Sequence, residues 1–331
     1  MDSLNKMISA ASGAINYIFN PTEKDKILIL TDDYSVSIAE AFERAALKKR
    51  CSVETYEINN NERPLKEIPT DLLQLLPGKT IVLNIIKAYP EEIAFRINWI
   101  FKVEENKLIK MGHMPGITVE MMLRSVNVDF LKMKRTADKL ISEFEDATHL
   151  HITTNEGTDI LLGVKDRIFV GDIGVSGGEM CNLPCGEIYC APIETEADGI
   201  VVFNASIGDI GVLEHPLKVF ISKGKIIKFE SDDADLIKRI TQLTDVDDDA
   251  WVIGELGIGV NPGAQITGNM LEDEKVICTA HIAFGNNADF PGGGKNNSKI
   301  HRDYLFYRPN IKAIFSDGTE KLIMANGEVI L

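Results

Sequence analysis

The sequence predicts an α/β N-terminal domain with a parallel sheet, followed by a mainly antiparallel α+β C-terminal domain. In residues 1–147, short apolar runs alternate with segments of helical periodicity, which is the pattern of strand-helix-strand units. In residues 148–331, short strands follow one another closely, turns are rich in Gly and Asp, and helices are few. The chain has 331 residues, of which 44% are hydrophobic, and this is enough to build two cores. We therefore expect one domain in each stretch.

In the N-terminal part, apolar runs predict strands at residues 26–30 and 80–86, and an alternating pattern predicts one at residues 52–58. Helices are expected between and after them, at residues 36–49 and 90–100. Asp32 and Asp33 follow the first strand, where a ligand contact is one interpretation. No Gly-rich phosphate-binding sequence comes after them, so we favour a capped helix start.

The region around Pro115-Gly116 predicts a turn, and Thr118 is placed to cap a helix after it. His113 precedes this turn and is a candidate auxiliary acid or base that reaches a cleft between the domains. The alternative is a structural histidine, because no motif surrounds it. Residues 129–146 predict a long amphipathic helix whose role is packing and connection.

The C-terminal part begins with an alternating apolar pattern that predicts a hairpin over residues 150–162. One helix is expected at residues 233–243. Further strands are predicted at residues 199–203, 217–222, 225–230, 251–254, 276–284 and 311–315, and at the end of the chain. This density of strands with few helices predicts antiparallel sheets.

Composition excludes several classes of partner. The formal net charge is -15 and no basic patch occurs, so nucleic acid is not an expected partner. No apolar stretch approaches the ~20 residues of a membrane span, and the first residues lack the pattern of a signal peptide, so a cytoplasmic protein without a membrane partner is expected. The five cysteines are expected as free thiols, because the spacing of Cys181, Cys185 and Cys190 is not that of a zinc ribbon.

Five side chains in the C-terminal part are candidate metal ligands. His281 lies within an apolar strand, and His301 and Asp303 are two positions apart, so they point to the same side of a strand. Glu187 and Glu255 each lie beside glycine in an apolar stretch, where a buried carboxylate is costly unless it is paired or bound to metal. This set of N and O donors suits two divalent ions that share a carboxylate.

Four segments carry a resemblance to a known family. Residues 182–192, 254–262, 274–285 and 301–303 resemble, in this order, the ligand motifs of the aminopeptidase T and thermophilic metalloprotease family. The resemblance implies a two-domain, usually homodimeric, metalloenzyme that removes N-terminal residues from peptide substrates. It implies two divalent ions (zinc, cobalt or manganese) and a metal-activated water that attacks the peptide carbonyl. The implied ligands are Glu187, Glu255, His281, His301 and Asp303, with Glu255 as bridge or catalytic base.

One position departs from the family, and it leaves alternatives open. Peptidases of the family carry a tyrosine where this chain has Ala288, and Tyr304 and Tyr307 are candidates to compensate. The same fold family, by resemblance, includes 2,5-dihydroxypyridine 5,6-dioxygenase, in which two histidines and one aspartate hold one Fe(II). His281, His301 and Asp303 would be that triad here.

We favour the hydrolase, because a mononuclear iron site does not require both candidate glutamates. A catalytically silent binding protein is the third hypothesis. The five metal-type side chains argue against it, because buried charges without a bound metal would destabilise the fold. The Gly- and Asn-rich loop at residues 285–297 lets His301 return toward His281, and its Gly292-Gly293-Gly294-Lys295 run is expected to be a flexible lid over the site.

Overall fold

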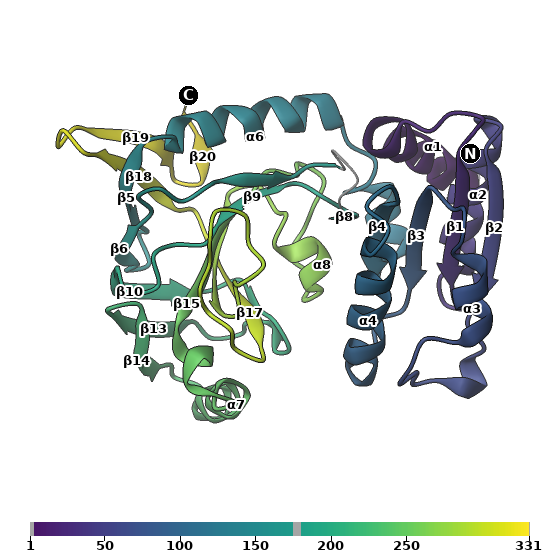
Figure 1. Cartoon of the computed structure of the whole chain (residues 1–331). Coiled ribbons are helices and arrows are strands. Elements are labelled where there is room, and N and C mark those ends of the chain that lie inside the picture. Colours follow the sequence, from purple (N-terminus) through teal and green to yellow (C-terminus); the bar gives the residue numbers. More distant parts are fainter. Residues whose placement is uncertain (1–2, 175–179, 331) are drawn as a thin grey trace. The chain divides into compact units, whose positions relative to one another are not determined.

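The computed structural model describes residues 3–174 and 180–330 (Figure 1). The chain divides into two compact units that are not consecutive in sequence. Unit 1 comprises Met1–Phe130 with Ile173–Cys185, and unit 2 comprises Leu131–Asp172 with Gly186–Leu331. The predicted division between residues 147 and 148 stays a prediction of domain organisation. The compact units differ from it because residues 131–147 belong with unit 2 and residues 173–185 return to unit 1.

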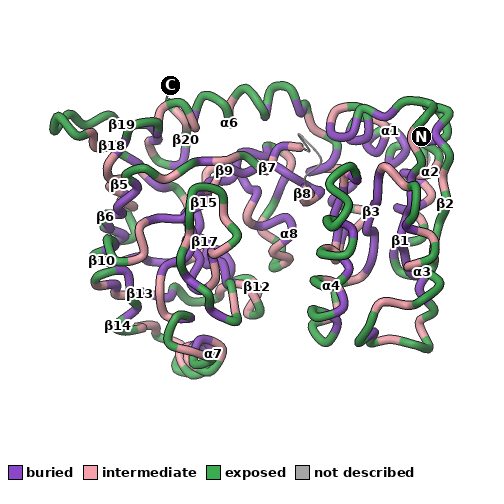
Figure 2. The backbone as a smooth tube through the Cα atoms, viewed as in Figure 1, coloured by how far each residue is buried: buried purple, intermediate pink, exposed green. Residues whose placement is uncertain are grey.

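Unit 1 contains a five-stranded parallel sheet with the strand order β2-β1-β3-β4-β8. Its strands are β1 (Lys26–Thr31), β2 (Ser52–Glu57), β3 (Ile81–Ile86), β4 (Lys110–Pro115) and β8 (Met180–Asn182). Its helices are α1 (Ser3–Ala14), α2 (Val36–Lys48), α3 (Thr70–Leu75), α4 (Ile93–Glu104) and α5 (Val119–Leu123). Figure 2 shows β3 buried along its length, as expected for a central parallel strand. The three predicted strands, which correspond to β1, β2 and β3, are confirmed, whereas β4, β8, α1 and α3 were not predicted.

Asp32, directly after β1, has a structural role, but the predicted helix cap is wrong, because the N-cap of α2 is Ser35 and α2 begins at Val36. Its Oδ1 accepts a hydrogen bond from the Ser35 backbone N–H at 3.0 Å, at the start of α2. Its other oxygen pairs with the guanidinium of Arg63, which also donates to Glu92 Oε2 at 2.5 Å. Both carboxylates are fully buried. Parallel sheets often bind ligands where the strand order reverses, which in this sheet is between β1 and β3. At this position Arg63 of the chain itself lies against Asp32.

Unit 2 contains two antiparallel sheets. One has eight strands in the order β14-β13-β10-β6-β5-β18-β19-β20, and the other has seven in the order β12-β11-β17-β16-β15-β9-β7. The strands of the first sheet are β5 (Ala147–Thr153), β6 (Asp159–Gly163), β10 (Ala197–Phe203), β13 (Leu217–Ser222), β14 (Lys225–Glu230), β18 (Asn310–Phe315), β19 (Glu320–Ala325) and β20 (Glu328–Val329). Those of the second are β7 (Val170–Asp172), β9 (Glu187–Cys190), β11 (Ser206–Ile207), β12 (Gly211–Val212), β15 (Ile253–Gly259), β16 (Thr279–Gly285) and β17 (His301–Tyr307). The parallel sheet of unit 1 and these antiparallel sheets agree with the predicted α/β and antiparallel character of the two parts.

The helices that accompany these sheets are α6 (Phe130–Phe144), α7 (Ala234–Thr244) and α8 (Met270–Asp273). The amphipathic pattern of α6 is confirmed, because the side chains of its apolar stripe are buried: Phe130, Met133, Ala137, Leu140 and Phe144. The five cysteines, all within the described residues, form no disulfide with one another, in agreement with the prediction. No helix in the described part of the chain is long and apolar enough to cross a membrane.

Candidate metal centre

The five candidate ligands lie on one face of the seven-stranded sheet. The antiparallel register places Glu255 on β15 beside Ala283 on β16, and Ala283 beside Asp303 on β17. Residues that pair directly across antiparallel strands point to the same face, and so do alternate residues along one strand. By the same register, Glu187 on β9 pairs with Gly259 of β15. The sequence alternation therefore brings side chains that are far apart in the chain to one surface, which we call the ligand face.

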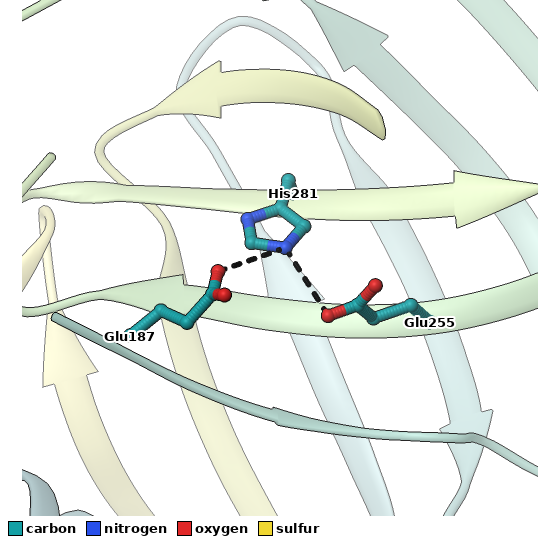
Figure 3. Close-up of side chains that lie close together, drawn as sticks. All are labelled: Glu187, Glu255 and His281. Atoms are coloured by element: carbon teal, nitrogen blue, oxygen red, sulfur yellow. Dashed lines mark ion pairs between the residues drawn. The ribbon is translucent and has the colours of Figure 1, made fainter. Parts of the chain in front are cut away.

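The donor atoms form two groups that share one carboxylate. Nε2 of His281 lies 3.5 Å from Oε2 of Glu187 and 3.5 Å from Oε1 of Glu255 (Figure 3). Nε2 of His301 lies 2.9 Å from Oε2 of Glu255 and 3.3 Å from Oδ1 of Asp303. Within each group, all three residues offer atoms that lie within 4.8 Å of one another. Glu255 thus presents one oxygen to each group.

Glycine leaves room for the imidazole of His281. Gly257 pairs with His281 across β15 and β16, and a Cβ on Gly257 would lie 2.0 Å from Nε2 of that ring. The ring therefore lies over the bare backbone of β15, between the two glutamates. A larger residue at position 257 cannot coexist with this ring position.

Burial and charge together set the protonation of the metal-free centre. Burial raises the pKa of Glu255, but the interactions with His281 and His301 outweigh it and hold that pKa at about 2. Burial lowers the pKa of His281, but the neighbouring carboxylates outweigh it and raise that pKa to about 9. The same balance raises the pKa of His301 well above its usual range, mainly through Asp303. Burial raises the pKa of Glu187.

A buried lysine, which the sequence analysis did not single out, holds Glu187. The ammonium of Lys275 lies 2.5 Å from Oε1 of Glu187, 2.6 Å from Oε1 of Glu274 and 3.3 Å from Oδ2 of Asp172. Its side chain is fully buried. A lysine is seldom buried unless it is paired with a carboxylate. Its place beside Glu274 in an otherwise apolar motif was therefore the sequence feature that could have predicted this buried ion pair. Lys275 fixes one oxygen of Glu187 and leaves the other facing His281.

The donor set fits divalent cations. Oε2 of Glu187, Nε2 of His281 and Oδ1 of Asp303 are buried and have no hydrogen-bond partner of ordinary geometry among the described residues. Such atoms are costly to bury, and a bound cation satisfies them. Carboxylate oxygens and imidazole nitrogens are ligands that zinc and similar divalent ions accept.

The loop between β16 and β17 makes hydrogen bonds to segments distant in the sequence, and the flexible lid expected at Gly292–Lys295 stays a prediction. Asn287 donates to the carbonyl of Gly254 at 3.0 Å, and Glu194 accepts from the backbone N–H of Lys295 at 2.7 Å. Asn296 donates to the carbonyl of Asp249 at 2.8 Å. Asparagine and glutamate side chains thus bond backbone groups and connect this loop to other segments.

Neither tyrosine proposed to compensate for Ala288 is well placed. Tyr304 points to the opposite face from Asp303, lies fully buried against Phe203, and has its hydroxyl 3.5 Å from Thr244 Oγ1. Tyr307 shares the ligand face but is four residues beyond Asp303, or about 13 Å along the strand. The tyrosine of the family motif therefore has no equivalent on β17.

His113, the candidate auxiliary acid or base, lies on β4 in unit 1. The indole N–H of Trp99 donates to Oδ1 of Asn84 at 2.8 Å, which leaves the Asn84 amide N–H₂ to donate to Nδ1 of His113 at 3.1 Å. Burial lowers the pKa of His113 to about 4. His113 is therefore neutral near pH 7 and carries its proton on Nε2. Its part in the reaction stays a prediction, and this state favours a hydrogen-bond donor over an acid or base.

Comparisons with known proteins agree with the resemblance found in the motifs. Residues 130–329 match the family model of the thermophilic metalloprotease (M29) family, whereas no curated protein matches the chain. The structure of 2,5-dihydroxypyridine dioxygenase from Pseudomonas putida KT2440 has a TM-score of 0.76 at 17% identity, over 100% of this chain and 98% of that one. AmpT from Thermus thermophilus has a TM-score of 0.75 at 17% identity, over 99% of both chains. These two similarities show a shared fold. Since the family model covers more than half of its residues, the chain belongs to the thermophilic metalloprotease (M29) family.

Proposed function

We propose that this chain is a metal-dependent aminopeptidase with two divalent ions that Glu255 bridges. The observation that carries the proposal is the arrangement of Glu255, whose Oε1 faces His281 and whose Oε2 faces His301. One carboxylate that offers a separate oxygen to each of two donor groups suits a bridging ligand. Because both oxygens have partners, this geometry also favours the bridging role of Glu255 over the role of catalytic base.

The charge of the site supports two ions rather than one. Lys275 contributes one positive charge to the centre. Five carboxylates lie around it: Asp172, Glu187, Glu255, Glu274 and Asp303. If metal binding leaves both histidines neutral and all five carboxylates ionised, the net charge of the residues is minus four, which two divalent ions neutralise and one ion leaves at minus two. Uncompensated buried charge is strongly unfavourable, so the two-ion centre is the more stable one.

The residues of the chain have distinct roles in the proposed reaction. Bound divalent ions lower the pKa of a water molecule and polarise the scissile carbonyl. His301 is the most accessible ligand, with 30% of its side chain exposed, so substrate approaches the centre on its side. Lys275 holds one oxygen of Glu187 and leaves the other oriented toward His281.

An Fe(II) ring-cleaving dioxygenase is the second candidate, which the shared fold with 2,5-dihydroxypyridine dioxygenase and the missing tyrosine favour. It requires His281, His301 and Asp303 around one ion. The described donor groups instead divide the two histidines between two positions. A silent binding protein is disfavoured, because the unpartnered donor atoms would then lack compensation.

Metal analysis of the purified and reloaded protein, with a screen of aminoacyl-p-nitroanilides, tests the proposal. We expect two zinc, cobalt or manganese ions per chain, hydrolysis in wild type, and loss of both in Glu255→Gln. Glu320→Gln, an exposed position on β19, is the matched control and should match wild type. Equal activity of wild type and Glu255→Gln would rule out the role of Glu255. One iron with oxygen uptake on an aromatic diol would support the dioxygenase, and no metal binding would support the silent protein. The homodimer and the cytoplasmic location implied earlier stay predictions.

A further inference from the structure

We propose that Tyr189 and Phe290 form an aromatic wall on the ligand face that selects peptides with an apolar, above all aromatic, N-terminal side chain. This inference rests on the proposed aminopeptidase function and names its substrate class. It comes from two aromatic residues that the metal centre itself does not use.

Tyr189 lies on the same face as the ligands. It follows Glu187 by two positions on β9, so both side chains point to the same side of the sheet. It pairs with Gly257 of β15, which on its other edge pairs with His281. The phenol ring therefore stands in the same row as the His281 imidazole, with only a glycine between the two strands that carry them. It is partly exposed, as a residue that meets substrate must be.

Phe290 connects this tyrosine to the other histidine. Its ring centroid lies 5.1 Å from that of Tyr189 at an interplanar angle of 72°, and 5.6 Å from that of His301 at 42°. Both separations are typical of contacting aromatic pairs. In the strand order β17-β16-β15-β9, three strand spacings of about 4.8 Å separate the strands of His301 and Tyr189. Phe290 therefore spans part of the ligand face that β15 and β16 form between them.

The wall is held in place before any substrate arrives. Phe290 belongs to the loop anchored through Asn287 and Asn296, and its own backbone N–H donates to the Asn287 carbonyl at 3.0 Å. A preformed apolar surface loses little conformational entropy on binding, so contact with it contributes fully to affinity.

The chemistry of the wall differs from that of the ligands beside it. The ions that the ligand face would hold bind the amino group and the polar backbone of a peptide. The aromatic rings offer apolar faces and edges, against which an aromatic or large aliphatic side chain packs. A substrate that has its amino group at the ions and its first side chain on the wall uses both surfaces.

The test compares phenylalanyl-, leucyl-, alanyl-, lysyl- and glutamyl-p-nitroanilide in metal-loaded wild type, Phe290→Ala, Phe290→Leu and Tyr189→Ala. Phe220→Ala is the matched control, because Phe220 is a partly buried phenylalanine on β13 of the other sheet. Calorimetric binding of phenylalanine and alanine hydroxamates to the same proteins gives a readout that does not depend on turnover. Metal content of each variant shows whether the centre is intact.

We expect wild type to prefer phenylalanyl and leucyl substrates. Phe290→Ala and Tyr189→Ala should reduce the ratio of kcat/KM for phenylalanyl over alanyl substrate by about 10- to 100-fold, with unchanged metal content. Phe290→Leu, which keeps apolar volume, should lie between wild type and Phe290→Ala. The hydroxamate affinities should follow the same order, and Phe220→Ala should match wild type.

A wild-type enzyme that cleaves lysyl or glutamyl substrates as well as phenylalanyl substrate would overturn the inference while leaving the aminopeptidase intact. Unchanged selectivity in both alanine variants would overturn it as well. Absence of hydrolysis of every substrate by the loaded wild type would instead contradict the proposed function. In that case, equal affinity for the two hydroxamates would also reject the wall.

Discussion

Replacing Gly257 by alanine should remove one of the two ions while leaving the fold in place. The new Cβ would lie 2.0 Å from Nε2 of His281 and 2.1 Å from its Cε1, whereas ordinary van der Waals contact begins at 3.4 Å. The ring must therefore move by about 1.4 Å, and metal–ligand distances tolerate only about 0.2 Å. Since His281 is buried, it has little space in which to move and still face both glutamates. We expect the affinity of the ion between Glu187, Glu255 and His281 to fall by at least about 100-fold.

The assay is metal content after dialysis, together with calorimetric titration of zinc. Wild type should bind two ions, and Gly257→Ala should keep the ion of the group that contains His301. Gly13→Ala is the control, because Gly13 is an exposed helical glycine whose added Cβ would meet no atom within 4 Å, and it should bind metal as wild type does. Circular dichroism checks that both variants fold. Two ions bound with wild-type affinity in Gly257→Ala would refute the position of the ring and the assignment of His281 as a ligand.

Three further predictions concern buried charge. Lys275→Met leaves the surrounding carboxylates without their ammonium and should destabilise the metal-free chain by about 3–5 kcal/mol in urea unfolding. Addition of zinc should restore part of this stability. An unchanged urea midpoint would contradict the pairing of Lys275 with these carboxylates. The pKa of His281 is raised from 6.5 to about 9, so the stability that its charged form contributes is complete below pH 6.5 and is lost as the pH rises through 9. The Tm of the metal-free chain should therefore fall between pH 6.5 and 9. Zinc binding at pH 7 should also release protons from His281 and His301, which calorimetry in buffers of different ionisation enthalpy detects. Zero proton release would show that both histidines are already neutral in the metal-free chain. Arg63→Met should destabilise unit 1 by about 3–5 kcal/mol without changing metal content, and a loss of metal would show that this cluster acts on the centre.

Local sequence patterns predicted most of the regular elements. Apolar runs indicated β1 and β3, because a strand that is buried on both faces has consecutive apolar residues. The amphipathic stripe indicated α6, because a helix that is buried on one face has apolar residues at helical spacing. Short strands such as β8 and β9 were missed. They owe their conformation to partners distant in the chain, and three or four residues carry too little periodicity to be recognised.

The loop after β16 has contacts that its composition does not predict. Asn287 and Asn296 bond the backbone of other segments and hold the loop. The same anchoring places Phe290 against His301. No local pattern predicts such contacts, because both partners must first be brought together by the sheet.

The sequence by itself determined which residues could bind metal and on which side of a strand each would lie. His301 and Asp303 share a face because side chains alternate along a strand, whatever the strand pairs with. Only the tertiary structure decided that Glu255 faces both histidines and that Lys275 holds Glu187, because strand order and register are set by the packing of the whole sheet. Alternation is a property of each strand alone, whereas convergence requires all of its neighbours.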